Sequence, residues 1–324
     1  MTYKPGYLRL LESGDLHHRI IMLRQHLEKC RLCPRKCEVN RIAGEKGFCG
    51  AGVTLEVASS CAHMGEEPVL TGKSGVGNIF LGRCNLRCVF CQNHSISQPE
   101  GSVPVSWRKT SEEAAEMLLD FQERGCKTVG LVSPTHYAPQ IFEAVALAAE
   151  KGLRIPLIYN SSGYDSPELL KTLEGLVDIY LPDFKYWDSD YAEKYSAAAD
   201  YPETARKAVL EMHRQVGQLR TDSDGVALRG LIIRLLVLPN GISGSEKVLR
   251  FIALKIGKDT FVSLMSQYNP MHHAKEYPLL SRKLKPYEYS EIEKVLLSLG
   301  FENGWTQDPV ASPDNYLPGS DFIL

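Results

Sequence analysis

The stretch Asn78-Ile-Phe-Leu-Gly-Arg-Cys-Asn-Leu-Arg-Cys-Val-Phe-Cys91 decides how the rest of the chain is interpreted. Its first four residues are an apolar run that predicts a strand, and a loop with the spacing Cys84-x3-Cys88-x2-Cys91 follows. Three thiolates this close do not complete a tetrahedral zinc site without a distant fourth ligand. A four-iron cluster normally binds four thiolates, so three would leave one iron open to a small chelating molecule. We therefore predict that Cys84, Cys88 and Cys91 ligate a 4Fe-4S cluster, and three structural cysteines on a turn are the alternative.

Downstream of this loop, apolar runs alternate with helical patterns. Further strands are predicted at 128–133, 155–160, 177–181, 228–238 and 260–268. Helices are predicted between them, and a capping box at Thr110-Ser-Glu-Glu113 opens the first. A helical stretch is predicted at 8–28, and one longer helical region is predicted to reach residue 217.

Strands that alternate with helices predict a parallel sheet with right-handed crossovers. About six such units predict an α/β fold with an open, partial (β/α)6 barrel of the TIM type, whose chemistry lies at the C-terminal ends of the strands. We divide the chain into a cysteine-rich N-terminal module (1–75), a barrel core (76–275) and a C-terminal helix and tail (276–324).

The cysteine spacing, with the aromatic Phe90 before the last cysteine, resembles the cluster loop of radical S-adenosylmethionine (SAM) enzymes. Together with Gly65-Glu-Glu-Pro68, the motif is similar to an uncharacterised branch related to pyruvate formate-lyase activating enzyme. The resemblance implies that SAM chelates the open iron and contacts Phe90. It also implies reductive cleavage of SAM to a 5'-deoxyadenosyl radical, which abstracts a hydrogen atom from a substrate.

Polar residues follow the next two predicted strands, namely Ser133 and Pro134 after the first and Asn160 and Ser161 after the second. In the family, backbone oxygens of a glycine-rich motif at the first of these places hold the amine of SAM. This chain departs from that motif, and the resemblance assigns the backbone contacts to Ser133 and Pro134. His136 either faces the substrate, or caps a helix, or lies on the surface.

Asp183 and Lys185 are two residues apart, so both point to one face if the strand extends this far. An exposed ion pair is the alternative. Activases of glycyl radical enzymes carry Asp-x-Lys at the corresponding strand end. This resemblance assigns Lys185 to SAM, and Asp183 with Asn160 and Ser161 to a monovalent cation beside the SAM carboxylate.

Arg234 interrupts an apolar run that is predicted to be a buried strand. A buried guanidinium without a partner costs several kcal/mol, so a partner must be present. A ligand carboxylate can supply it, because arginine binds carboxylates through two hydrogen bonds. An internal Asp or Glu is the alternative. The resemblance agrees with a ligand carboxylate as the partner of Arg234, since activases use an arginine on this strand for the SAM carboxylate.

A second set of cysteines precedes the barrel, with the spacing Cys30-x2-Cys33-x3-Cys37-x11-Cys49. Four thiolates within twenty residues are enough to close a coordination sphere. Zinc, a second iron–sulfur cluster and a metal-free arrangement all remain open.

Composition narrows the function classes further. A net charge of -2 gives no general attraction to nucleic acid, and the most apolar stretch, at 231–238, is far shorter than the ~20 residues of a membrane span. No apolar signal region follows Met1, so a cytoplasmic protein that does not contact membranes is expected.

Three functions stay open. The first is a radical SAM oxidoreductase that draws on a low-potential electron donor and acts on a protein substrate, whose glycine loses a hydrogen atom. The second is radical modification of a small molecule or peptide, with an auxiliary cluster. The third is a non-catalytic iron–sulfur protein that transfers electrons.

Overall fold

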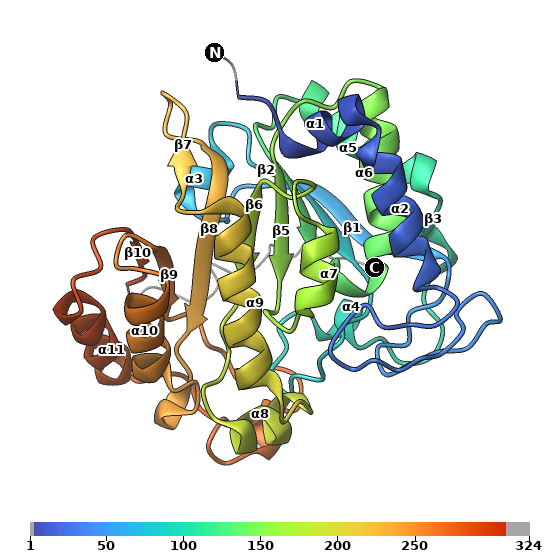
Figure 1. Ribbon diagram of the computed structural model, residues 1–324. Coiled ribbons are helices and arrows are strands. Elements are labelled where there is room, and N and C mark those ends of the chain that lie inside the picture. The colour runs from blue at the N-terminus through green and yellow to red at the C-terminus, as the bar shows by residue number, and fades with distance from the viewer. Residues whose placement is uncertain (1–2, 309–324) are drawn as a thin grey trace.

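The computed structural model describes residues 3–308, which form one ten-stranded sheet with helices packed against it (Figure 1). Six parallel strands make up the middle of the sheet, in the order in which the chain visits them. They are β2 (Val76–Leu81), β4 (Val129–Val132), β5 (Leu157–Ser161), β6 (Ile179–Pro182), β8 (Ala227–Leu236) and β9 (Phe261–Met265). This order confirms the predicted α/β fold with an open, partial barrel.

Four strands that the sequence pattern did not predict extend the sheet. They are β1 (Leu55–His63), β3 (Arg108–Lys109), β7 (Arg220–Thr221) and β10 (Gly304–Thr306). β1 pairs with β2 in antiparallel register, and β10 pairs with β9 in parallel register. The middle of β1 reads Ala58-Ser-Ser-Cys61 and is partly exposed, so it lacks the apolar alternation by which strands are recognised.

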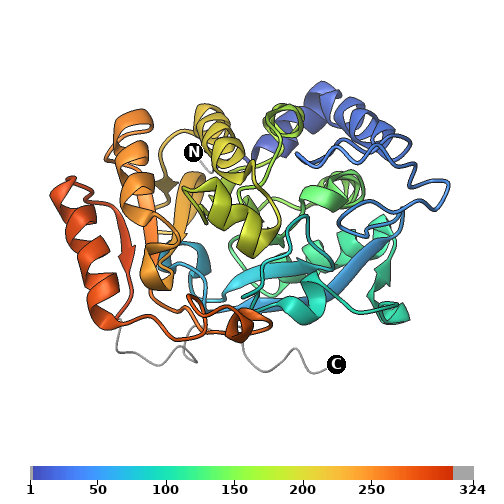
Figure 2. The same ribbon diagram turned by 90° about the horizontal axis from the view of Figure 1, so that it is seen from below.

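Most helices lie along the outer side of the curved sheet, as the view from below shows (Figure 2). The long helices that follow the parallel strands are α5 (Ser111–Glu123), α6 (Ala138–Glu150), α9 (Tyr201–Val216), α10 (Ser245–Lys255) and α11 (Pro286–Ser298). Shorter ones are α3 (Pro68–Thr71), α4 (His94–Ser97), α7 (Pro167–Thr172) and α8 (Ser189–Ser196). The capping box at the start of α5 is confirmed, with both of its hydrogen bonds present.

Two predicted helical stretches are each divided in two by a left-handed residue. Gly14, with φ 79°, separates α1 (Gly6–Ser13) from α2 (Asp15–Gln25). Ala197, with φ 54°, ends α8 before α9 begins. A residue in this conformation cannot continue a right-handed helix, so each of the two predicted helical regions consists of two helices.

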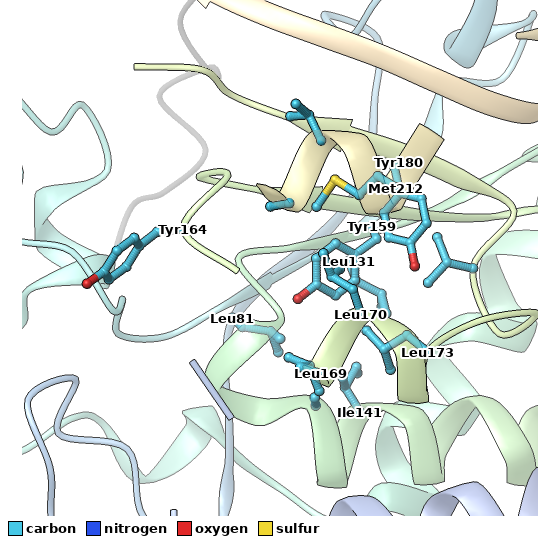
Figure 3. Packing of buried hydrophobic residues seen from close by; sticks show 14 of the residues in the cluster. Leu81, Leu131, Ile141, Tyr159, Tyr164, Leu169, Leu170, Leu173, Tyr180 and Met212 are labelled. Carbon is cyan, nitrogen blue, oxygen red and sulfur yellow. The ribbon is translucent and has the colours of Figure 1, made fainter. Parts of the chain in front are cut away.

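The core fixes the strands against the helices (Figure 3). Leu131, Tyr159 and Tyr180 of the sheet are fully buried against α6, α7 and α9. Each such side chain contributes roughly 1.5–3 kcal/mol through burial. The strands therefore form a rigid support for the residues at their C-terminal ends.

The proposed three-part division of the chain stays a prediction. Helices α1 and α2 pack against α6 of the barrel core, and β10 joins the sheet from the C-terminal part. Within residues 3–308, no helix combines the length and apolar character that crossing a membrane requires.

Candidate functional site

The loop with the three closely spaced cysteines (residues 84–91, the cysteine loop) leaves the C-terminal end of β2 without a helix or strand of its own. Its backbone is held by the end of α8. The Arg87 N–H donates to the Ser196 carbonyl at 3.1 Å, and the Val89 N–H donates to the Tyr195 carbonyl at 2.9 Å. The shape of the loop therefore depends on a segment more than a hundred residues away.

Each thiol of the cysteine loop has a polar group beside its sulfur. The Leu86 N–H donates to Cys84 Sγ at 3.4 Å, the Ser196 hydroxyl donates to Cys88 Sγ at 3.0 Å, and the Ser97 hydroxyl lies 3.1 Å from Cys91 Sγ. Hydrogen bonds to sulfur are among the means by which proteins set the properties of iron–sulfur clusters.

The thiols also need a cation in order to ionise. Burial raises the pKa of all three thiols, that of Cys84 to about 12 and that of Cys91 to about 11. Bound metal supplies the positive charge that stabilises such thiolates. Within residues 3–308 no three His, Cys, Asp or Glu side chains are arranged to hold a single metal ion. The three sulfur donors and their hydrogen bonds fit an iron–sulfur cluster with one iron left for another ligand.

A cavity of about 560 Å³ lies beside the cysteine loop and reaches into the partial barrel. Its size is within the range of small-molecule sites. Its walls come from the cysteine loop, the ends of the parallel strands, the segment before α3 and the segments after β9 and β10. The lining includes Cys88, Phe90, Cys91, Asn160, Asp183, Lys185, Arg234, Glu66, Glu67, Tyr268 and Gln307.

Asp183 lies between two cations in this cavity. Its Oδ2 accepts a hydrogen bond from Lys185 Nζ at 2.6 Å, and its Oδ1 accepts one from Arg234 Nε at 2.9 Å. Burial alone would raise the pKa of Asp183, but Arg234 and Lys185 together hold it below its usual range. Asp183 is therefore ionised near neutral pH and keeps both cations at the strand ends.

Arg234 has the internal partners that a buried guanidinium requires. Besides Asp183, its Nη2 donates to Asn160 Oδ1 at 2.8 Å, and its Nη1 lies 3.6 Å from Glu66 Oε2. The internal ion pair that the sequence left open is thus present. A guanidinium has five N–H groups, so it can hold these partners and still donate to a ligand.

Glu66 and Glu67 are site residues that the sequence reasoning missed. Glu66 Oε1 accepts from Asn78 Nδ2 at 2.9 Å. Glu67 is 8% exposed, and its Oε2 has no hydrogen-bond partner within residues 3–308. Burial raises the pKa of Glu67, and Glu66 adds to this while Arg234 opposes it. The available signal was the Gly65-Glu-Glu-Pro68 motif, but nothing in the sequence places this segment opposite the ends of β8 and β9.

Phe90 lies in the aromatic wall of the cavity. Its ring meets those of Tyr186 and Tyr268 edge-on, at centroid distances of 6.4 and 5.8 Å. Edge-on contacts of this kind are favourable and fix the ring in place. The last part of the cysteine loop is thereby anchored to the segments after β6 and β9.

Three of the predicted SAM-binding or cation-binding residues do not line the cavity, namely Ser133, Pro134 and Ser161. The Ser133 N–H donates to the Asn160 carbonyl at 2.8 Å. The Ser161 hydroxyl donates to Asp165 Oδ2 at 2.6 Å, so it serves a buried network next to the cavity. The roles assigned to these three residues stay predictions.

His136 also lies away from the cavity. Its Nε2 donates to the Gly82 carbonyl at 2.8 Å, and its own carbonyl accepts from Arg41 at 2.6 Å. Burial lowers the pKa of His136 to about 3, so the ring is neutral and holds structural contacts. The predicted surface position is wrong for this residue, which is 1% exposed and does not line the cavity.

The four N-terminal cysteines gather in the irregular segment between α2 and β1. Cys30, Cys33 and Cys49 are buried, and Cys37 is half-buried. The Cys33 thiol interacts electrostatically with the other three. The structure therefore gathers the four thiols in one segment, although within residues 3–308 no three such side chains are arranged to hold a single metal ion.

The family model described as "Radical SAM superfamily" matches residues 78–223. Two relatives are uncharacterised proteins of Methanocaldococcus jannaschii. One, MJ0674, is 30% identical over 294 residues, which are 89% of this chain and 79% of the relative. The other, MJ0808, is 26% identical over 293 residues, 85% of this chain and 78% of the relative.

Solved structures with a similar fold are more distant. Streptococcus suis SuiB is 13% identical with a TM-score of 0.47, and covers 70% of this chain and 47% of its own. HydG, a maturase of the FeFe-hydrogenase, is 11% identical with a TM-score of 0.47, and the match covers 70% of this chain and 50% of HydG. Methylornithine synthase (PylB) is 18% identical with a TM-score of 0.44, and the match covers 68% of this chain and 62% of PylB. This chain spans about half the length of the first two.

Proposed function

We propose that this chain, which belongs to the radical SAM superfamily, cleaves SAM reductively and abstracts a hydrogen atom from a substrate held in the cavity beside the cysteine loop. Membership of the family implies a 4Fe-4S cluster, SAM and a reductant. Cys84, Cys88 and Cys91 would hold the cluster, which when bound supplies the electron that cleaves SAM. One observation supports the proposal most: two of these thiols and the Lys185–Asp183–Arg234 ion network line the same cavity.

Lys185 and Arg234 would bind the carboxylate of SAM. The Lys185 ammonium has three N–H groups, of which Asp183 accepts one, and it interacts electrostatically with the Cys88 thiol. A carboxylate bound here would place the amino-acid end of SAM beside the cysteine loop. Asp183 holds both cations in position, and with Asn160 it offers the oxygen atoms proposed for a monovalent cation.

The rings of Phe90 and Tyr268, which line the cavity, and that of Tyr186, which packs against Phe90, would exclude water from the amino-acid end of SAM. All three rings are buried and contact one another through Phe90. Excluding water protects reactive intermediates from side reactions.

Two substrate classes are proposed. The first is a glycine in a partner protein, and it is supported by the Asp183-x-Lys185 resemblance to activases of glycyl radical enzymes. The second is a small molecule or peptide side chain with a cationic or hydrogen-bond-donating group. A specific observation favours this second class, because Glu66 and the nearly buried Glu67 place two carboxyl groups in the cavity.

The test is an anaerobic assay for 5'-deoxyadenosine with SAM and a chemical reductant. We expect product from the wild type and none from Cys88→Ala. The matched control is Cys126→Ala, which removes a buried cysteine that lies outside both cysteine groups. A glycyl radical signal on a partner protein would select the first substrate class, and deuterium transfer from a labelled small molecule the second. If cluster-loaded wild type neither binds nor cleaves SAM, the chain is an electron-transfer protein instead.

A further inference from the structure

Arg41 is a buried cation set among the N-terminal thiols. It is 2% exposed, and its Nη2 donates to Cys30 Sγ at 3.0 Å and lies 3.8 Å from Cys49 Sγ. Within residues 3–308, its one other hydrogen bond is to the His136 carbonyl, its Nε has no partner, and no carboxylate pairs with it. A guanidinium does not lose its proton in proteins, so its charge needs an anion. The Cys30 and Cys49 sulfur atoms beside it carry negative charge once they bind a metal.

A second donor and a close backbone approach complete this site. The Phe48 N–H donates to Cys37 Sγ at 3.4 Å, as the Leu86 N–H does to Cys84 Sγ in the cysteine loop. A side chain at Gly47 would place its Cβ 2.8 Å from Cys37 Sγ, so the chain can pass this thiol only as glycine. The N-terminal segment is therefore built around its sulfur atoms.

We infer that Cys30, Cys33, Cys37 and Cys49 hold a second iron–sulfur cluster, with Arg41 as its counter-ion, which passes electrons to the cluster of the cysteine loop. The part of this inference in which the cluster of the cysteine loop accepts the electrons rests on the proposed function. Hydrogen bonds to sulfur and the net charge around a cluster set its reduction potential.

Arg87 links the two groups of thiols. Its guanidinium interacts electrostatically with the thiols of both Cys84 and Cys49. Its Nη1 donates to the Cys84 carbonyl at 2.9 Å, its Nη2 donates to the Phe48 carbonyl, and the group lies 4.7 Å from the centre of the Phe48 ring. One side chain of the cysteine loop thus contacts the N-terminal segment directly.

A second, smaller cavity of about 240 Å³ lies beside Cys49 and is separated from the cysteine loop's thiols by Arg87 and Ser97. Its lining includes Cys49, Arg87 and Ser97, and the Ser97 hydroxyl contacts Cys91 Sγ. This placement favours a redox centre over zinc, because zinc has no redox chemistry with which to serve a neighbouring cluster.

The electron balance is simple. A low-potential one-electron carrier reduces the second cluster, which returns to its oxidised state when it reduces the cluster of the cysteine loop. No atom or proton is transferred in either step. The carrier supplies the electron, and the smaller cavity beside Cys49 is the point at which it would approach.

The first test is metal analysis of anaerobically prepared protein, which needs no SAM. We expect about eight iron atoms per chain in the wild type and about four in Cys30→Ala/Cys33→Ala, since each cluster holds four. About four iron atoms plus one zinc in the wild type would overturn the inference, as would four iron atoms and no other metal.

The second test uses Arg41→Gln and needs no cysteine substitution. Loss of a counter-ion should shift the potential of the second cluster to a more negative value in a redox titration followed by electron paramagnetic resonance. The matched control is Arg31→Gln, which removes an exposed arginine beside the same cysteines and should leave the potential unchanged. If the reduction potential is the same in both variants, Arg41 is not the counter-ion of the second cluster.

The relay itself is tested by comparing two reductants, flavodoxin and dithionite. We expect Cys30→Ala/Cys33→Ala to lower the ratio of the flavodoxin-driven to the dithionite-driven rate of SAM cleavage at least tenfold. An unchanged ratio would overturn the relay. If the wild type fails to cleave SAM with either reductant, the proposed function fails, while the iron count and the Arg41 potential still decide the second cluster.

Discussion

Asp183→Asn tests whether one carboxylate holds the ion network of the cavity together. The substitution keeps the size of the side chain and removes its charge. Lys185 and Arg234 then lose the anion that lies 2.6 and 2.9 Å from them, and the nearest remaining carboxylate oxygen is Glu66 Oε2, 3.6 Å from Arg234. Two buried cations are left close together.

The expected cost is about 3 kcal/mol of unfolding free energy. Removing one partner of a buried ion pair costs roughly 3–5 kcal/mol. The three side chains are each 18% exposed, so some solvent screening applies and the lower end of this range is expected. A change of this size alters the unfolding equilibrium constant roughly a hundredfold.

The measurement is denaturant unfolding of the anaerobic protein, with Asp120→Asn as the matched control. Asp120 pairs with Arg124 on the surface of α5, and its loss should cost about 0.5 kcal/mol or less. Because the folded pKa of Asp183 is lowered, its contribution is full above the unfolded pKa, about 3.9, and is lost as pH falls through the folded pKa. Equal losses of unfolding free energy in the two variants would refute the reasoning. So would a difference between the wild type and Asp183→Asn that persists below the folded pKa of Asp183.

The remaining predictions concern two residues of the same cavity and a glycine that packs against the Asp183 backbone. Lys185→Met should weaken SAM binding about tenfold or more, because a charge-assisted hydrogen bond contributes ~1.5–3 kcal/mol, and equilibrium binding to the cluster-loaded protein measures this. Glu67→Gln should flatten the pH dependence of the unfolding free energy. Because the pKa of Glu67 is raised in the folded state, the stability of the wild type falls as pH rises from the unfolded pKa of about 4.3 toward the folded one. The same pH profile in the variant and the wild type would contradict the burial argument. Gly163→Ala should destabilise by roughly 1–3 kcal/mol more than Gly14→Ala, since both have positive φ but only at Gly163 would the Cβ lie 2.2 Å from the Asp183 carbonyl.

The barrel could be predicted because its strands and helices obey local rules. The strands are apolar runs separated by helical periods, and the start of α5 is marked by its capping box. The unpredicted strands lack such signals. β10 has three residues, and β1 is stabilised by its pairing with β2 and not by its own pattern.

The site could be predicted only where its residues lie close in sequence or interrupt an apolar run. Cys84, Cys88 and Cys91 were found by their spacing, and Arg234 by the energetic cost of its burial. Glu66 was missed because its contact with Arg234 joins the segment before α3 to the end of β8. That contact depends on how the segment folds back into the partial barrel, which no local pattern encodes.

The charge state of Glu67 separates the two proposed substrate classes. With burial and Glu66 both raising its pKa, Glu67 takes up a proton more readily than an ordinary carboxyl group. A cationic substrate group beside it would lower that pKa, so binding would release a proton, whereas a glycine backbone carries no charge and would release none. The proton balance of substrate binding, measured by calorimetry in buffers of different ionisation enthalpy, therefore reports which class the cavity accepts, and Glu67→Gln would abolish the release only if the substrate is cationic.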